Sequence, residues 1–137
     1  MTLVAPISAG TAMILAVLFI KLAFAVIKKR QQHKVALGTG QHPDLEAAMR
    51  AHGNFAEYVP LSLFLLLCAE VNGAYVWMLA SAATALVVGR YIHAMAITDS
   101  DLKKRVLGMQ LTFVSLALGV GANLTALVLA LLRMLKS

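Results

Sequence analysis

Charged residues are scarce in this 137-residue chain: only 13% are Asp, Glu, Lys or Arg, whereas 61% are hydrophobic. A soluble domain is about a quarter charged and about half apolar, so this chain has too little polar sequence to cover a water-soluble globule. The single cysteine, Cys68, excludes an internal disulfide and is expected to be a small core residue. The first residues lack the basic segment of a signal peptide, so the first apolar run is expected to remain as a membrane helix.

Four apolar segments are long enough to cross a bilayer, since about 20 helical residues span the ~30 Å hydrocarbon core. Their expected ranges are 6–27, 44–71, 74–97 and 106–132. The sequence therefore predicts an all-α membrane protein, with one four-helix transmembrane domain over residues 1–137.

The basic residues lie mainly in two connections, which predicts an orientation. Loop 28–43 contains four Lys or Arg residues and loop 98–105 contains three, whereas the other side has only Arg133 and Lys136. By the positive-inside rule, both loops are expected in the cytoplasm and both termini in the periplasm. No aromatic-basic motif accompanies these residues, so we expect no nucleic-acid partner.

Polar residues inside the membrane segments are expected to have a function, because burying them in lipid is costly. Arg50, Asn54 and Glu57 share one face of the second segment, and Arg90 and His93 share one face of the third. The second segment leaves the cytoplasmic side and the third returns to it. These residues should therefore lie in one layer with the start of the fourth segment, where Arg105 stands.

Two interpretations of this layer remain open. The arginines outnumber the single glutamate, which favours an anionic ligand such as a carboxylate, a phosphate or a thiolate. Alternatively, the layer is a structural network in which Glu57 pairs with Arg50 or Arg90, Asn54 bridges helices and His93 makes an interhelical hydrogen bond. His52 has no second ligand at a suitable spacing, so we expect no metal site. The chain has no internal repeat or broken helix, and so lacks the usual signature of a transporter.

Two motifs give a resemblance to a known family. Residues 50–60 read Arg-x-His-x-Asn-x-x-Glu-x-x-Pro, and residues 89–93 read Gly-Arg-x-x-His. With Arg105 at the fourth helix, this pattern resembles the MAPEG family, the membrane-associated proteins in eicosanoid and glutathione metabolism, over essentially the whole chain. The runs at 52–54 and 70–73 resemble the bacterial inner-membrane subgroup.

The resemblance implies a homotrimer in the membrane lipid, with glutathione as co-substrate bound between subunits near the cytoplasmic side. It implies glutathione transfer to apolar electrophiles, reduction of lipid hydroperoxides or isomerisation of eicosanoids. Arg105 would be the catalytic residue that stabilises the thiolate. The glutathione-binding residues would be Arg50, Asn54, Glu57, Arg90 and His93.

Four positions depart from the prostaglandin-synthase-like members. Gly53 replaces an arginine that contacts glutathione, Ile97 and Met109 replace tyrosines, and Val106 replaces a serine. Eicosanoid isomerisation is therefore not expected. The main hypothesis is a glutathione-dependent transferase or peroxidase acting on lipophilic small molecules in a bacterial inner membrane. The alternative is a non-catalytic member whose polar layer is structural or binds another anionic ligand.

Overall fold

The computed structural model of the chain describes residues 3–98 and 101–135. They form four α-helices, α1 Pro6–His33, α2 Pro43–Val71, α3 Val76–Thr98 and α4 Leu102–Met134, and no strand occurs within these ranges. All four are long and apolar enough to cross a membrane, which confirms the predicted fold class. Residues 99–100 of the expected cytoplasmic loop, and Lys136 of the opposite side, lie outside the described residues.

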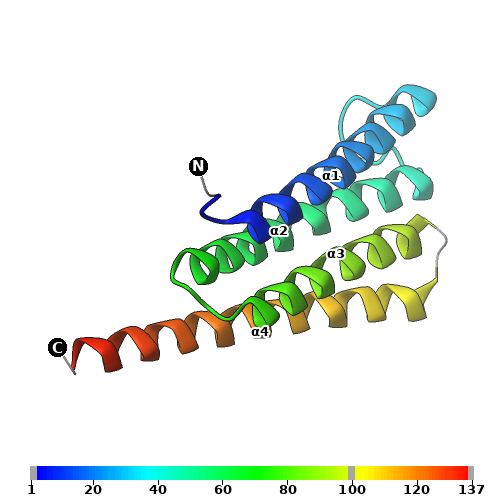
Figure 1. Cartoon of the computed structure of the whole chain (residues 1–137). Coiled ribbons are helices and arrows are strands. Elements are labelled where there is room, and N and C mark those ends of the chain that lie inside the picture. The colour runs from blue at the N-terminus through cyan, green and yellow to red at the C-terminus, as the bar shows by residue number, and fades with distance from the viewer. Residues whose placement is uncertain (1–2, 99–100, 136–137) are drawn as a thin grey trace.

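The helices form two antiparallel pairs, α1 with α2 and α3 with α4, joined by packing of α2 and α3 (Figure 1). The connection between α1 and α2 and the one between α3 and α4 lie together, at what we call the loop end. The short α2–α3 turn lies at the opposite, turn end, where α1 begins. The last turns of α4 extend beyond the other helices there.

The outward surface of the bundle is apolar along its length. Phe24 on α1, Phe64 on α2 and Leu124 on α4 are among the large hydrophobic side chains that are exposed. Only the inner faces are buried, and α3 has the largest buried share of the four. Such a surface is compatible with lipid as the surrounding solvent and not with water.

Polar side chains join the helices through the core. Ser115 Oγ on α4 donates a hydrogen bond to the Ala82 carbonyl of α3 at 2.8 Å. Asn123 Nδ2, also on α4, donates to the Leu65 carbonyl of α2 at 2.8 Å. Hydrogen bonds of this kind add to close packing in holding membrane helices together, because lipid supplies no hydrophobic force between them.

Two helices extend beyond their predicted bounds toward the loop end. α1 continues past residue 27 to His33, because its last residues are good helix formers and its basic side chains suit the negative end of the helix dipole. α4 begins at Leu102, ahead of the expected residue 106, because the Asp101 carboxylate caps it by accepting from the Lys104 amide at 3.1 Å. Arg105 therefore lies in the first turns of α4.

Glu70, near the end of α2, caps the start of α1. Its two carboxylate oxygens accept hydrogen bonds from the backbone amides of Ile7, at 2.8 Å, and Ser8, at 2.7 Å. The residue before Pro6 provides no side-chain cap of its own. The carboxylate thus satisfies two free amides and fixes α1 against α2 at the turn end.

Candidate functional site

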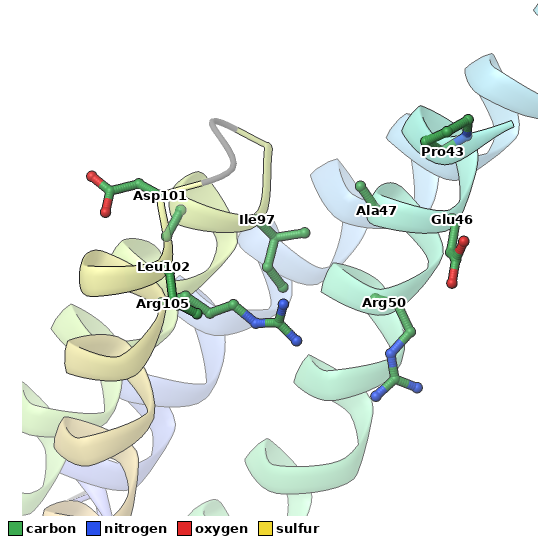
Figure 2. A pocket seen from close by; sticks show the side chains of 9 residues that line it. Pro43, Glu46, Ala47, Arg50, Ile97, Asp101, Leu102 and Arg105 are labelled. Atoms are coloured by element: carbon green, nitrogen blue, oxygen red, sulfur yellow. The ribbon is translucent and has the colours of Figure 1, made fainter.

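A pocket of about 330 Å³ opens at the loop end, between the first turns of α2, the last turn of α3 and the start of α4. Arg50 and Glu46 contribute from α2, Ile97 from α3, and Arg105 from α4. In Figure 2, the Arg105 guanidinium points into the space toward α2, and the Arg50 side chain extends along the α2 side of it. The pocket therefore brings together two of the six predicted site residues.

Both pocket arginines are exposed and form no ion pair with another described residue. The two acids at the pocket differ in what they do. Asp101 is held by α4: it accepts from the Lys104 amide and pairs with Lys104 Nζ at 3.2 Å. These hydrogen bonds lower the pKa of Asp101 below its ordinary value. Glu46 is exposed and forms no such pair among the described residues. Because Lys104 balances Asp101, the pocket keeps two arginines against one free carboxylate, a net excess of one positive charge.

One helical turn deeper, Arg90 of α3 is almost wholly buried, with 1% of its surface exposed. Its Nη1 donates to Asn54 Oδ1 on α2 at 2.8 Å, and its Nη2 lies 3.4 Å from Met109 Sδ on α4. The guanidinium carbon also lies 5.8 Å from the centre of the Tyr58 ring. Nε is buried without a hydrogen-bond partner, and no described carboxylate pairs with the guanidinium. A buried charge of this kind requires compensation.

The interhelical bridge that the structural interpretation assigned to Asn54 is thus formed, whereas the other contacts of that network are not formed among the described residues. Glu57 is exposed and pairs with neither Arg50 nor Arg90 in the described part of the chain. It points outward from the bundle because it lies on the far face of α2 from the core residues Phe55 and Val59.

His93 is buried where α3 and α4 come closest. A Cβ atom on Gly108 would lie 2.7 Å from both the backbone N and Cβ of His93, and 2.8 Å from the Gly89 carbonyl oxygen. Two glycines therefore allow the helix backbones to touch at this level. The expected interhelical hydrogen bond is not formed, since the His93 ring bonds to no other described residue.

The four positions that depart from the prostaglandin-synthase-like members lie at or beside the pocket and the buried Arg90. Ile97 lines the pocket, Val106 is exposed next to Arg105, and Met109 supplies the sulfur contact to Arg90. A Cβ atom on Gly53 would meet nothing within 4 Å. The site is therefore poorer in hydroxyl groups than the resemblance implies, but it has room for a side chain at residue 53.

Glu46 and Asp101, which line the pocket, and Met109, which contacts Arg90, were not among the predicted site residues. Glu46 stands four residues before Arg50, a spacing that places both on one face of α2. The Met109 contact had no comparable signal, because a methionine in an apolar helix is ordinarily core filler. Within residues 3–98 and 101–135, no three His, Cys, Asp or Glu side chains gather to hold a metal ion.

Comparisons with known proteins agree with this description. The model of the MAPEG family matches residues 8–132. A protein called inner membrane protein YecN, from Escherichia coli strain K12, is 38% identical over 118 residues, which covers 86% of this chain and 90% of that protein. The protein of the same name from E. coli O6:H1 matches to the same extent.

Proposed function

The chain belongs to the MAPEG family, and from this premise we propose that it activates glutathione for reaction with lipophilic small molecules in the bacterial inner membrane. The observation that carries the proposal is the pocket at the loop end, lined by two arginines that form no ion pair with another described residue. Four spanning helices and the name of the E. coli relatives support an integral inner-membrane protein. In the proposed orientation, loops 28–43 and 98–105 are cytoplasmic and both termini are periplasmic.

The charges of the pocket suit those of glutathione. This tripeptide carries two carboxylates, one ammonium group and a thiol. Arg50 would bind a carboxylate in a forked contact, and Glu46 is placed to accept from the ammonium. Arg105, in the first turns of α4, would hold the sulfur as thiolate with help from the positive end of the helix. Lowering an ordinary thiol pKa of about 8.5 by about two units requires only ~2.7 kcal/mol.

The chemistry follows from a thiolate beside an apolar bundle. In transfer, the sulfur lone pair forms a carbon–sulfur bond with the electrophile, and the leaving group departs with its bonding electrons or a conjugated acceptor takes up a proton. In peroxide reduction, two glutathione molecules are oxidised to the disulfide while one hydroperoxide is reduced to an alcohol and water. Both reactions use only glutathione and the lipophilic substrate.

A homotrimer with the site completed by a neighbouring subunit is part of the proposal. Glu57 carries a carboxylate on the outward face of α2, and Arg90 carries a buried guanidinium without a described acid. An ionised group facing lipid is costly, so an outward Glu57 favours a protein or ligand neighbour. In this arrangement, Asn54, Glu57, Arg90 and His93 bind or brace the glutathione that Arg50 and Arg105 hold.

A second candidate, a non-catalytic membrane protein, is favoured by the Arg90–Asn54 contact. That hydrogen bond joins α2 and α3 within a single protomer and is complete without a ligand. In this alternative, the deeper level holds the helices together, and the pocket is unused or binds another anion.

Titration of the purified protein in detergent with glutathione distinguishes the two candidates. The ultraviolet absorbance of the thiolate is followed for the wild type, Arg105→Ala and a control, Lys103→Ala. Lys103 is an exposed cation on the same turns of α4 but does not line the pocket. We expect a saturable thiolate signal for the wild type and the control, and its loss in Arg105→Ala.

Two results would contradict glutathione activation. One is the absence of a signal at millimolar glutathione, which would leave the non-catalytic candidate. The other is an equal loss in Arg105→Ala and Lys103→Ala, which would mean that general positive charge, and not the pocket, causes the signal.

A further inference from the structure

A second cavity system lies away from the arginine pocket, in the groove between α1 and α2. It consists of two adjoining cavities of about 430 Å³ and 270 Å³, which share Ala12 and Leu63. Every side chain lining them is apolar except that of Ser8. Each cavity is near the size of a small-molecule site, and together they make one elongated apolar groove on the outer side of the two helices.

The groove is about as deep as one leaflet of a bilayer. It extends along α1 from Ser8, in the first turn, to Phe19. These residues are separated by about 16 Å along the helix, close to half of the ~30 Å hydrocarbon core. Ser8 lies beside the carboxylate of Glu70, at the turn end, where the membrane surface is expected. The groove therefore starts at that surface and ends near the middle of the membrane.

The shallow end has a buried hydroxyl without a partner. Ser8 is 5% exposed, and its Oγ forms no hydrogen bond with another described residue. Its backbone amide is occupied by Glu70, so the side-chain hydroxyl is the group left for a ligand. An unsatisfied polar atom in an apolar site is costly, which indicates that a bound molecule supplies the missing partner.

At the deep end the groove is lined by the aromatic rings of Phe19 and Phe55. The Phe19 ring lies 4.7 Å from that of His52 and 5.7 Å from that of Phe55, centre to centre. A helix of another subunit would need a groove that continues along the bundle, whereas this one ends at the rings. A single flexible hydrocarbon chain fits an apolar groove of one leaflet depth that ends at these rings.

We propose that this groove binds one acyl chain of a bilayer phospholipid, whose ester carbonyl accepts a hydrogen bond from Ser8 Oγ. The chain lies along Ala12 and ends against Phe19. This lipid site is separate from the arginine pocket and does not depend on glutathione binding there, so either proposal can fail without the other.

Photo-labelling in vesicles tests the lipid site. The full chain is reconstituted in phosphatidylethanolamine and phosphatidylglycerol with a trace of phospholipid that carries a diazirine on its acyl chain, placed near the ester or near the terminal methyl. Labelled peptides are mapped by mass spectrometry. The first probe should label residues around Ser8 and Leu67, and the second those around Phe19 and Phe55. Each should exceed labelling at Leu124, an exposed residue of α4, several-fold.

Three variants accompany the wild type. Ala12→Leu fills the point that the two cavities share, and should abolish the excess labelling by the deep probe. Ala25→Leu adds the same volume at an exposed position of α1 outside the groove, and should leave the labelling unchanged. Ser8→Ala, which removes one neutral hydrogen bond, should lower labelling by the shallow probe roughly two- to tenfold.

The proposal is overturned if labelling is even around α1, or if it falls equally in Ala12→Leu and Ala25→Leu. It is also overturned if a photo-reactive residue in place of Ala16 captures a second protein chain instead of lipid, because the groove is then a helix interface. Circular dichroism and gel filtration check that each variant folds. Should Ala12→Leu not fold, two other results decide the question. They are the difference between the sites labelled by the shallow and the deep probe in the wild type, and the labelling of Ser8→Ala.

Discussion

The guanidinium of Arg90 on α3 and the side-chain amide of Asn54 on α2 form a direct hydrogen bond of 2.8 Å inside the bundle. Asn54 is the only described side chain that supplies an oxygen to this buried cation, and its backbone carbonyl is a second, longer contact at 3.5 Å. The pair therefore connects α2 with α3, and it also gives the buried Arg90 charge its hydrogen-bond acceptor.

Asn54→Ala should destabilise the protein markedly. It leaves a buried charged donor without its oxygen acceptor, and we expect a loss of about 1–3 kcal/mol or more. The measurement is the free energy of unfolding in mixed detergent micelles, obtained from denaturation with sodium dodecyl sulfate.

The matched control is Asn72→Ala at the turn end. Asn72 follows α2 and is exposed, and among the described residues its side chain bonds only to the Cys68 carbonyl of that helix, at 2.7 Å. Its loss should change stability by no more than about 0.5 kcal/mol. Equal effects of the two substitutions would argue against the bridging role of Asn54.

The closest approach of α3 and α4 gives a second prediction. Gly108→Ala places a methyl group 2.7 Å from the backbone N and Cβ of His93, so the helices must separate. We expect a destabilisation of about 1–3 kcal/mol, measured in the same unfolding assay. Gly10→Ala is the control: its Cβ meets nothing within 4 Å, and helix propensity alone should make it neutral or stabilising by up to about 1 kcal/mol. A neutral Gly108→Ala would show that the two helices can separate without cost.

Much of this site was predictable from the chain because helical periodicity and topology are strong constraints. The spacing of Arg50 and Asn54 places them on one face, and the return of the chain in α3 brings Arg90 to the same level. The sequence also contains a signal for the early start of α4, because aspartate is a favoured N-cap residue and Asp101 directly precedes the helix.

The remaining features depend on how the helices are rotated, which periodicity alone does not determine. Glu57 shares a stripe with Asn54 in the sequence, yet one faces outward and the other reaches Arg90. Glu70 lies near the end of α2, yet it caps the start of α1. That contact joins residues more than sixty positions apart and follows from the packing of α1 on α2.

Acid should loosen the start of α4. Hydrogen bonds from Lys104, the backbone one first, lower the pKa of Asp101 in the folded protein. Its stabilising effect is therefore fully present above its ordinary pKa near 3.8 and is lost as the pH falls through the lower folded value. We expect the hydrogen-exchange protection of the Lys104 amide, corrected for intrinsic rate, to fall below about pH 4.

Asp101→Asn provides the comparison, because asparagine caps a helix without a titrating group. In this variant, the hydrogen-exchange protection of the Lys104 amide should stay constant across the same pH range. A parallel fall in the variant and the wild type would assign the loss to some other group.

Residue 53 offers a gain-of-function test of the glutathione proposal. The family resemblance implies an arginine there, and a Cβ atom on Gly53 would meet nothing within 4 Å, so a side chain can start at this position without a clash. Gly53→Arg should tighten glutathione binding by about tenfold if its guanidinium bonds a glutathione carboxylate, as measured by isothermal titration calorimetry.

Gly53→Gln separates charge from helix propensity in this test. Glutamine improves the helix about as much as arginine but adds no charge, so its glutathione affinity should remain that of the wild type. If both variants bind more tightly by the same factor, helix rigidity and not recognition is the cause. If neither binds more tightly although both fold, glutathione does not reach this face of α2, and the orientation of the ligand proposed for the pocket is wrong.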